Sequence, residues 1–164
     1  MTTMPGKSSF PENHELSLGS SAVSTTKMIH HFLNKSDVVF AIGTSLTRTP
    51  YGRDIPEGKI IIHSTNDPFD INKDYNVDYG LIGDSKLVLQ DLISCINNKV
   101  TNFEKYNNLN IRQEIKKIKK EWLSEWENKL HSDETPLNFY LLLIIFGKVI
   151  KKKNLNKSLI NNFH

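Results

Sequence analysis

Two short apolar runs dominate the pattern of this chain, and each ends abruptly in small or polar residues. The first covers residues 38–42 and stops at Gly43, and the second covers residues 59–63 and stops at Ser64. A short apolar run bounded by turn residues is typical of a strand buried on both faces of a parallel sheet. A third, shorter strand is expected within residues 77–84.

Two amphipathic helices are predicted around these strands, because apolar residues recur there every three or four positions. The first begins at residue 24, with Ser24 or Thr25 as its N-cap. Its expected apolar face consists of Met28, Ile29, Phe32 and Leu33. The second covers residues 85–97, with Asp84 or Ser85 as its cap. Its expected buried side consists of Leu87, Val88, Leu92, Ile93 and Ile96.

Beyond these elements the chain becomes polar and helical. Residues 111–131 carry a narrow apolar stripe, with Trp122 and Trp126 at helical spacing. Residues 139–146 form an apolar run that is shorter than the ~20 residues of a membrane span, so it needs cover from other protein. The pattern predicts an α/β fold: a partial Rossmann-like parallel sheet of three to four strands flanked by helices, followed by a helical C-terminal extension.

The composition is ordinary for a soluble globular protein, with 38% apolar and 24% charged residues. Its single cysteine, Cys95, excludes a disulfide framework and fits a reducing compartment, so we expect a cytoplasmic protein without a membrane segment. Residues 1–98 hold 8 Lys/Arg and 11 Asp/Glu, whereas residues 99–164 hold 13 and 7. Because the basic part lacks an arginine cluster and an aromatic stacking platform, no nucleic-acid binding is expected.

A ligand is expected beyond the carboxyl ends of the first two strands, which is the usual binding position in open α/β sheets. Gly43 permits close approach, Ser45 and Thr47 offer hydroxyl groups, and Arg48 can pair with a phosphate. Asp67 can accept hydrogen bonds from ribose hydroxyls, although it also fits a helix cap. The loop equally fits a solvated crossover, since no GxGxxG or Walker spacing is present.

Four segments, taken in order, resemble the central domain of thiamine-diphosphate-dependent enzymes of the acetolactate synthase and 2-oxo acid decarboxylase type. They are TTMPGKSSFPENHELSLG, DVVFAIGTSLTRTPYG, KIIIHSTNDPFDINKDY and VDYGLIGDSKLVLQDLI. The resemblance implies a partial central domain over residues 1–98, a linker and strap helix over 99–135, and the truncated start of a following domain, or a divergent tail, over 136–164.

In the full enzymes of this family, a pyrimidine-binding, a central and a pyrophosphate-binding domain together hold thiamine diphosphate and magnesium in a homo-oligomer. The family's activating glutamate belongs to the first domain, and its metal-binding Gly-Asp-Gly motif belongs to the third. No Gly-Asp-Gly occurs here, because Gly83-Asp84 is followed by Ser85. We therefore expect no catalytic or metal-binding residue in this chain, and no cofactor bound without the other domains or subunits.

In some members the central domain binds FAD or an adenine nucleotide without using it in catalysis. The matching positions here are Gly43, Thr44, Ser45, Thr47, Arg48, Asn66 and Asp67. The leading hypothesis is accordingly a fragment of a thiamine-diphosphate-dependent lyase or carboligase acting on 2-oxo acids. The alternatives are a stand-alone adenine-nucleotide-binding module and a helix-mediated assembly factor that works through the two tryptophans and residues 139–146.

Overall fold

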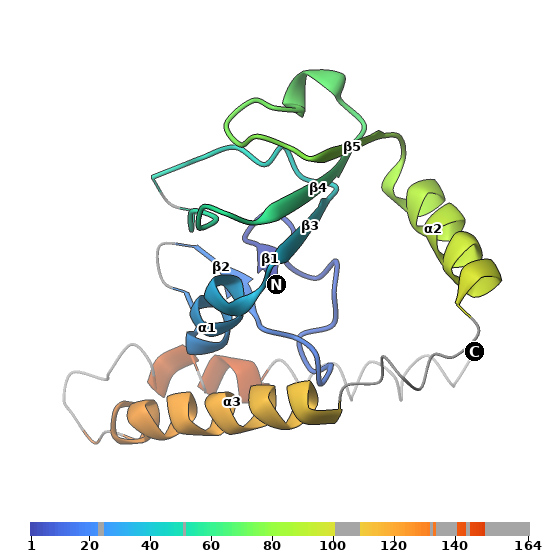
Figure 1. Ribbon diagram of the computed structural model, residues 1–164. Helices are drawn as coiled ribbons and strands as arrows, with labels where there is room; N and C mark the ends of the chain where they lie inside the picture. Colours follow the sequence, from blue (N-terminus) through green and yellow to red (C-terminus); the bar gives the residue numbers. More distant parts are fainter. Residues whose placement is uncertain are drawn as a thin grey trace, which may run out of the picture. The chain divides into compact units, whose positions relative to one another are not determined.

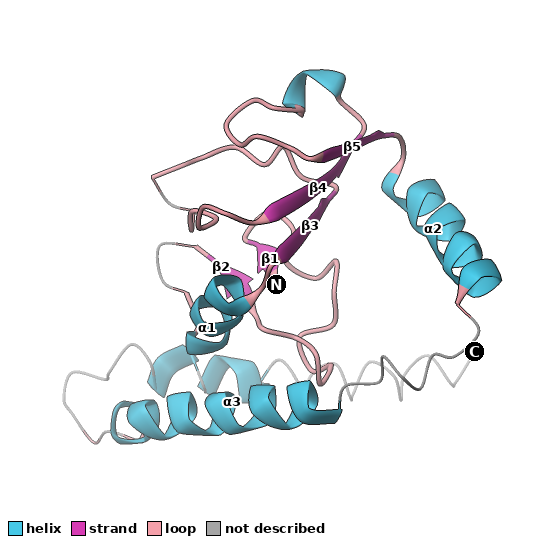
Figure 2. Ribbon diagram, viewed as in Figure 1, coloured by secondary structure: helices cyan, strands magenta, loops and turns pink. Residues whose placement is uncertain are grey.

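A parallel three-stranded sheet with order β3-β4-β5 organises the first part of the chain (Figures 1 and 2). The computed structural model describes residues 1–22, 25–50, 52–100, 109–131, 133, 141–143 and 145–149. The chain divides into two units, Met1–Lys119 and Lys120–His164, and the sheet belongs to the first. The predicted α/β fold is confirmed, whereas the divisions expected at residues 98 and 135 stay predictions.

The three strands match the expected runs, with one difference in length. β3 covers Val38–Ile42, β4 covers Ile60–Thr65 and β5 covers Tyr79–Ile82. β4 continues past His63, where the prediction ended, because Ser64 and Thr65 are buried and pair with the neighbouring strands. Loss of apolar character therefore did not mark the end of this strand.

Residues 1–22 form turns closed by a small second sheet. Its strands are β1, Thr2–Thr3, and β2, Ser20–Ser21, which pair in parallel. The Thr2 amide donates to the Gly19 carbonyl at 3.1 Å, and the hydroxyls of Thr2 and Ser20 lie 3.0 Å apart. This pairing brings residues 20–21 next to residues 2–3, so the two ends of the segment lie side by side.

Helix α1, Lys27–Lys35, leads into β3 and buries its apolar side. Its N-cap is Thr26, whose hydroxyl accepts from the Ile29 amide at 3.2 Å and donates to the Leu18 carbonyl at 2.7 Å. The cap expected at Thr25 is therefore one residue too early, and Ser24 lies outside the described residues. The second bond of Thr26 is a tertiary contact, which the local sequence does not reveal. The buried residues are Met28, Ile29 and Leu33.

Helix α3, Leu109–Leu130, starts in the first unit and is joined there to α1. The Glu114 carboxylate bonds the Lys35 ammonium at 2.8 Å and the His31 ring at 2.7 Å. Ile115, beside it in the sequence, is only 4% exposed. Within one turn of α3, Glu114 thus provides the charged contact to α1, and Ile115 provides a buried apolar side chain.

In the second unit, residues 141–143 and 145–149 are helical, in line with the apolar run expected at 139–146. Their larger apolar side chains, including Leu143 and Phe146, are exposed. Among the described residues, no helix has the length and apolar character needed to cross a membrane.

Helix α2, Ser85–Lys99, begins at the predicted cap, since the Asp84 carboxylate accepts from the amides of Lys86 and Leu87. The expectation that its apolar side is buried is wrong, because α2 has no buried residue. The expectation that β3 is buried on both faces is wrong too, because Val38 and Phe40 are 47% and 38% exposed. Sequence patterns identify the apolar side of an element but not whether another element covers it.

Replacing Glu114 by Gln should weaken the joint between α1 and α3 only where the carboxylate is charged. Hydrogen bonds from Lys35 and then His31 lower the pKa of Glu114 below its ordinary value of 4.5. The stabilisation is therefore present above pH 4.5 and is lost as pH falls through the lowered pKa. We expect a melting temperature lower by no more than about 3 °C at pH 7.

Thermal melts followed by circular dichroism between pH 7 and pH 3 check this prediction, with exposed Glu57→Gln as the matched control. The difference between wild type and Glu114→Gln should shrink as pH falls from 4.5 toward the acid end of the range. A difference of constant size would contradict the assignment to the charged carboxylate.

Candidate functional site

A shallow depression of about 280 Å³ lies at the carboxyl ends of all three parallel strands. This is the edge where the sequence predicts a ligand, because side chains that follow parallel strands converge there. The lining residues come from the turns after β3, β4 and β5 and from the start of α2. They are Gly43, Thr44, Ser45, Thr65, Asn66, Asp70, Asp84 and Ser85.

The turn after β3 depends on a glycine conformation and on a buried histidine. Gly43 has φ +62°, its amide donates to the Ser64 carbonyl at 2.9 Å, and a Cβ there would lie 3.0 Å from the Ser85 hydroxyl. The fully buried His63 bonds the Thr44 carbonyl through Nε2 at 2.8 Å. Since a carbonyl only accepts, Nε2 is assigned the proton, and this bond holds the turn.

His63 is a structural part of the site that sequence reasoning missed, since it was read only as the end of an apolar run. Among the described residues, neither its buried Nδ1 nor the buried Ser64 hydroxyl has a hydrogen-bond partner. A polar pair within an otherwise apolar strand is the signal that could have identified it, because buried polar groups need a reason to be there.

The far side of the depression is acidic. The Asp70 carboxylate accepts from the Thr65 hydroxyl at 3.4 Å and pairs with Lys73 at 3.5 Å. Asp84 uses one oxygen for the first turn of α2. The eight lining residues include these two carboxylates and neither Lys nor Arg. Such a lining suits neutral hydroxyl-bearing groups and disfavours phosphate.

Four of the seven predicted site residues line the depression: Gly43, Thr44, Ser45 and Asn66. Thr47 bonds the Ser45 hydroxyl at 3.0 Å, and Asp67 accepts from the Phe69 amide at 2.9 Å, which makes it the cap of the short helix η1, Pro68–Asp70. Four further lining residues were not predicted as site residues: one ends β4, one ends η1, and two stand at the cap and first position of α2. They are Thr65, Asp70, Asp84 and Ser85.

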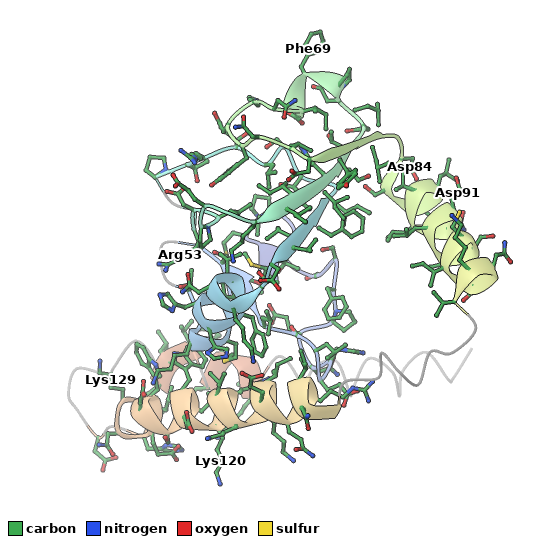
Figure 3. The ribbon with its side chains drawn as sticks, viewed as in Figure 1. Arg53, Phe69, Asp84, Asp91, Lys120 and Lys129 are labelled. Carbon is green, nitrogen blue, oxygen red and sulfur yellow. The ribbon has the colours of Figure 1, made fainter. Side chains whose placement is uncertain are left out.

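Arg48 lies in a different place, within a second depression of about 340 Å³. Its guanidinium lies over the Tyr75 ring, 4.6 Å from the centroid, and its amide donates to Asp74 at 2.8 Å. The Tyr75 hydroxyl accepts from the Ile55 amide at 3.3 Å. Figure 3 shows Arg53, from the same loop, on the opposite side of the sheet from Asp84. The loop thus directs both arginines away from the first depression.

Comparison with known proteins identifies relatives of this chain. The family described as thiamine pyrophosphate enzyme, central domain, matches residues 1–92. A probable acetolactate synthase large subunit of Methanococcus aeolicus is 30% identical over 172 residues, which covers 97% of this chain and 27% of the relative. A probable acetolactate synthase large subunit of Methanocaldococcus jannaschii is 39% identical over 99 residues, which covers 58% of this chain and 16% of the relative.

A putative thiamine pyrophosphate-containing protein of Bacillus subtilis is 30% identical over 135 residues, which covers 82% of this chain and 21% of the relative. The chain therefore spans about a quarter of the length of the curated relatives that match most of it. The similarity to the Methanococcus aeolicus and Bacillus subtilis proteins extends past residue 92, beyond the part matched by the central domain.

Replacing Gly43 by Ala should damage the edge that forms the depression. The left-handed backbone conformation costs about 1–2 kcal/mol for a residue with a Cβ, and contact with the Ser85 hydroxyl adds to that cost. We expect a loss of about 2–3 kcal/mol in the free energy of unfolding, measured by urea denaturation.

Gly58→Ala is the matched control, because Gly58 also has positive φ, +78°, but a Cβ there meets nothing within 4 Å. It should lose only the conformational part. Equal losses at the two glycines would remove the argument that Gly43 is needed for the close approach of α2.

Proposed function

Because the chain belongs to the thiamine pyrophosphate enzyme family, we propose that it serves as the central domain of a cytoplasmic lyase or carboligase acting on 2-oxo acids. In this proposal residues 1–98 form a partial central domain, residues 99–135 form a linker and strap helix, and residues 136–164 are the start of the following domain or a divergent tail. The observation that carries the proposal is the family match over residues 1–92.

The family implies thiamine diphosphate, whose bound form supplies a nucleophilic carbon that attacks a 2-oxo acid. The residues described here do not fit that cofactor by themselves. The residues that line the depression include two carboxylates and neither Lys nor Arg for a pyrophosphate. Within the described ranges, no group of three or more His, Cys, Asp or Glu side chains could hold a metal ion. We therefore assign thiamine diphosphate and Mg²⁺ to other domains or subunits of a homo-oligomer.

In this proposal the chain holds other parts of the enzyme in place and takes no direct part in the reaction. The sheet edge and α1 with the first part of α3 form a scaffold, whose parts are joined by Glu114 and by the turns at Gly43 and Gly83. The acetolactate synthase relatives support the assignment to 2-oxo acid chemistry.

The isolated 164-residue chain should not consume a 2-oxo acid in the presence of thiamine diphosphate and Mg²⁺. A chimera of the Methanococcus aeolicus relative, with the matching segment replaced by residues 1–92 of this chain, should form acetolactate. The chimera carrying Gly43→Ala is its structural control and should form less. Turnover by the isolated chain would reject the proposed role.

An adenine-nucleotide-binding module is the second candidate function, and the depression at the strand ends favours it. Gly43, Thr44, Ser45 and Asn66 line a site of suitable position, and three of them carry a hydroxyl or amide group. Thr47, Arg48 and Asp67, which are engaged elsewhere, would take part only after leaving their present partners. The acidic lining favours a ribose over a phosphate.

Isothermal titration calorimetry with adenosine, ADP, FAD and NAD tests the module. Adenosine should bind at least as tightly as ADP, with a dissociation constant of about 100 µM or lower. Asn66→Ala should weaken binding about tenfold through the loss of one hydrogen bond. Asn97→Ala on α2 and Arg48→Ala should leave it unchanged. No binding by any of the four ligands would remove this candidate.

A further inference from the structure

A set of contacts centred on Tyr75 holds the Arg48 side chain in the second depression. The Arg48 guanidinium stacks over the Tyr75 ring, and the Arg48 amide donates to the Asp74 carboxylate at 2.8 Å. The Tyr75 hydroxyl donates to Asp54 at 3.1 Å and accepts from the Ile55 amide at 3.3 Å, which fixes the far end of the ring. Figure 1 shows the two segments that carry these residues, between β3 and β4 and between β4 and β5, close to each other. We call these contacts the Tyr75 clasp.

The guanidinium is the weakly held part of the clasp. Within the described ranges it stacks on Tyr75 and forms no hydrogen bond or ion pair with another side chain. A cation over a partly exposed aromatic ring is held weakly, whereas paired hydrogen bonds to a phosphate are among the strongest that arginine forms. A phosphate within reach would therefore draw the guanidinium away from the ring.

A strained residue separates Arg48 from the first depression. Thr44 and Ser45 line that depression, and Leu46, the next residue, has φ +49°. This left-handed conformation is unfavourable for a residue with a Cβ, and the Thr44 hydroxyl supports it by accepting from the Leu46 amide at 3.2 Å. Arg48 follows Ser45 by three residues, which is at most about 11 Å of extended chain. Its long side chain is therefore within reach of the first depression once the turn at Leu46 relaxes.

Arg48 carries the charge that the lining of the first depression lacks. Asp70 and Asp84 line it together with neither Lys nor Arg, so a phosphate bound there lies near two carboxylates. An arginine beside the phosphate would offset this repulsion and supply two parallel donors. The place of one side chain thus decides whether the depression suits an uncharged ligand or a phosphate-bearing one.

We propose that Tyr75 is the specificity-determining residue of the first depression. By holding Arg48 in the second depression, Tyr75 keeps the first one selective for a neutral nucleoside. Loss of the clasp brings Arg48 to the strand ends and admits a nucleoside diphosphate. Tyr75 acts through Arg48 and does not touch the ligand. The proposal rests on the adenine-nucleotide-binding candidate, and it adds the residue that decides which form of the nucleotide the site takes.

Calorimetry with adenosine and ADP tests the proposal through the ratio of their dissociation constants. The wild type should bind adenosine at least as tightly as ADP. Tyr75→Leu should bind ADP at least about tenfold more tightly than the wild type does, while its affinity for adenosine changes by less than about threefold. Combining Tyr75→Leu with Arg48→Ala should restore the wild-type ratio, because the released cation is then missing.

Two further variants separate specificity from structure. Tyr75→Phe loses the hydroxyl bonds to Asp54 and Ile55 but keeps the ring under Arg48, so it should retain the wild-type ratio. Tyr79→Leu makes the same change at a 62% exposed tyrosine of β5 that lines neither depression, and it should also retain that ratio. If circular dichroism finds Tyr75→Leu unfolded, Tyr75→Met takes its place with the same expected gain for ADP.

Nuclear magnetic resonance of the arginine side chains tests the clasp without a ligand. The chain has three arginines, Arg48, Arg53 and Arg112, so only three Nε–Hε signals need to be assigned. The ring current of Tyr75 should displace the Arg48 signal in the wild type and in Tyr75→Phe, and this displacement should disappear in Tyr75→Leu. A wild-type Arg48 signal that does not respond to the loss of the ring would overturn the proposal.

The binding results distinguish this proposal from the one on which it rests. If the wild type binds adenosine and the ratio is the same in folded Tyr75→Leu, the role of Tyr75 is rejected and the nucleotide-binding candidate stands. If neither ligand binds to the wild type or to Tyr75→Leu, both are rejected. A gain for ADP that persists without Arg48 would also reject the role of Tyr75, because the gain would then not come from the released guanidinium.

Discussion

The end of β4 is the constraint on which the candidate site depends. The Ser64 carbonyl accepts from the Gly43 amide and the Thr65 carbonyl accepts from the Gly83 amide, each at 2.9 Å. Because β4 lies between β3 and β5, two adjacent residues hold the turns that follow both neighbours. His63, on the same strand, adds the bond to the Thr44 carbonyl. The depression is therefore a product of parallel register, and its shape is set by backbone bonds before any lining side chain is considered.

Charge then limits what this edge can do. Asp70 and Asp84 face the depression, while Arg48 is held over Tyr75 in a separate one. A site with carboxylates and hydroxyls but no cation is suited to sugar-like groups and unsuited to pyrophosphate. This arrangement supports a positional role in a thiamine pyrophosphate enzyme, where the groups that hold the cofactor come from elsewhere. For the nucleotide-binding alternative, it favours recognition of the ribose over recognition of the phosphates.

In the first unit some apolar side chains are buried, whereas others on the sheet and on α2 are exposed. The buried apolar residues are few: Met28, Ile29, Leu33, Ala41, Ile61 and Ile115. They gather on α1, on one face of the sheet and on the first part of α3, which Glu114 ties to α1. The exposed apolar surfaces of β3, β4, β5 and α2 contribute little hydrophobic stabilisation while they remain exposed. Burial of those surfaces is where this unit has most stability to gain.

The sequence by itself determined the elements and much of the site. Apolar runs located β3 and β4, and the side-chain chemistry of Asp84 located the start of α2, since apolar patterning and helix capping are local properties. Strand-end logic found Gly43 and Ser45, and the family resemblance added Thr44 and Asn66. Only the tertiary structure decided that Thr26 caps α1, that His63 supports the turn, and that Arg48 turns to Tyr75. It alone showed that the apolar side of α2 is exposed. Each of these depends on contacts between residues distant in the chain, which periodicity and residue type do not encode.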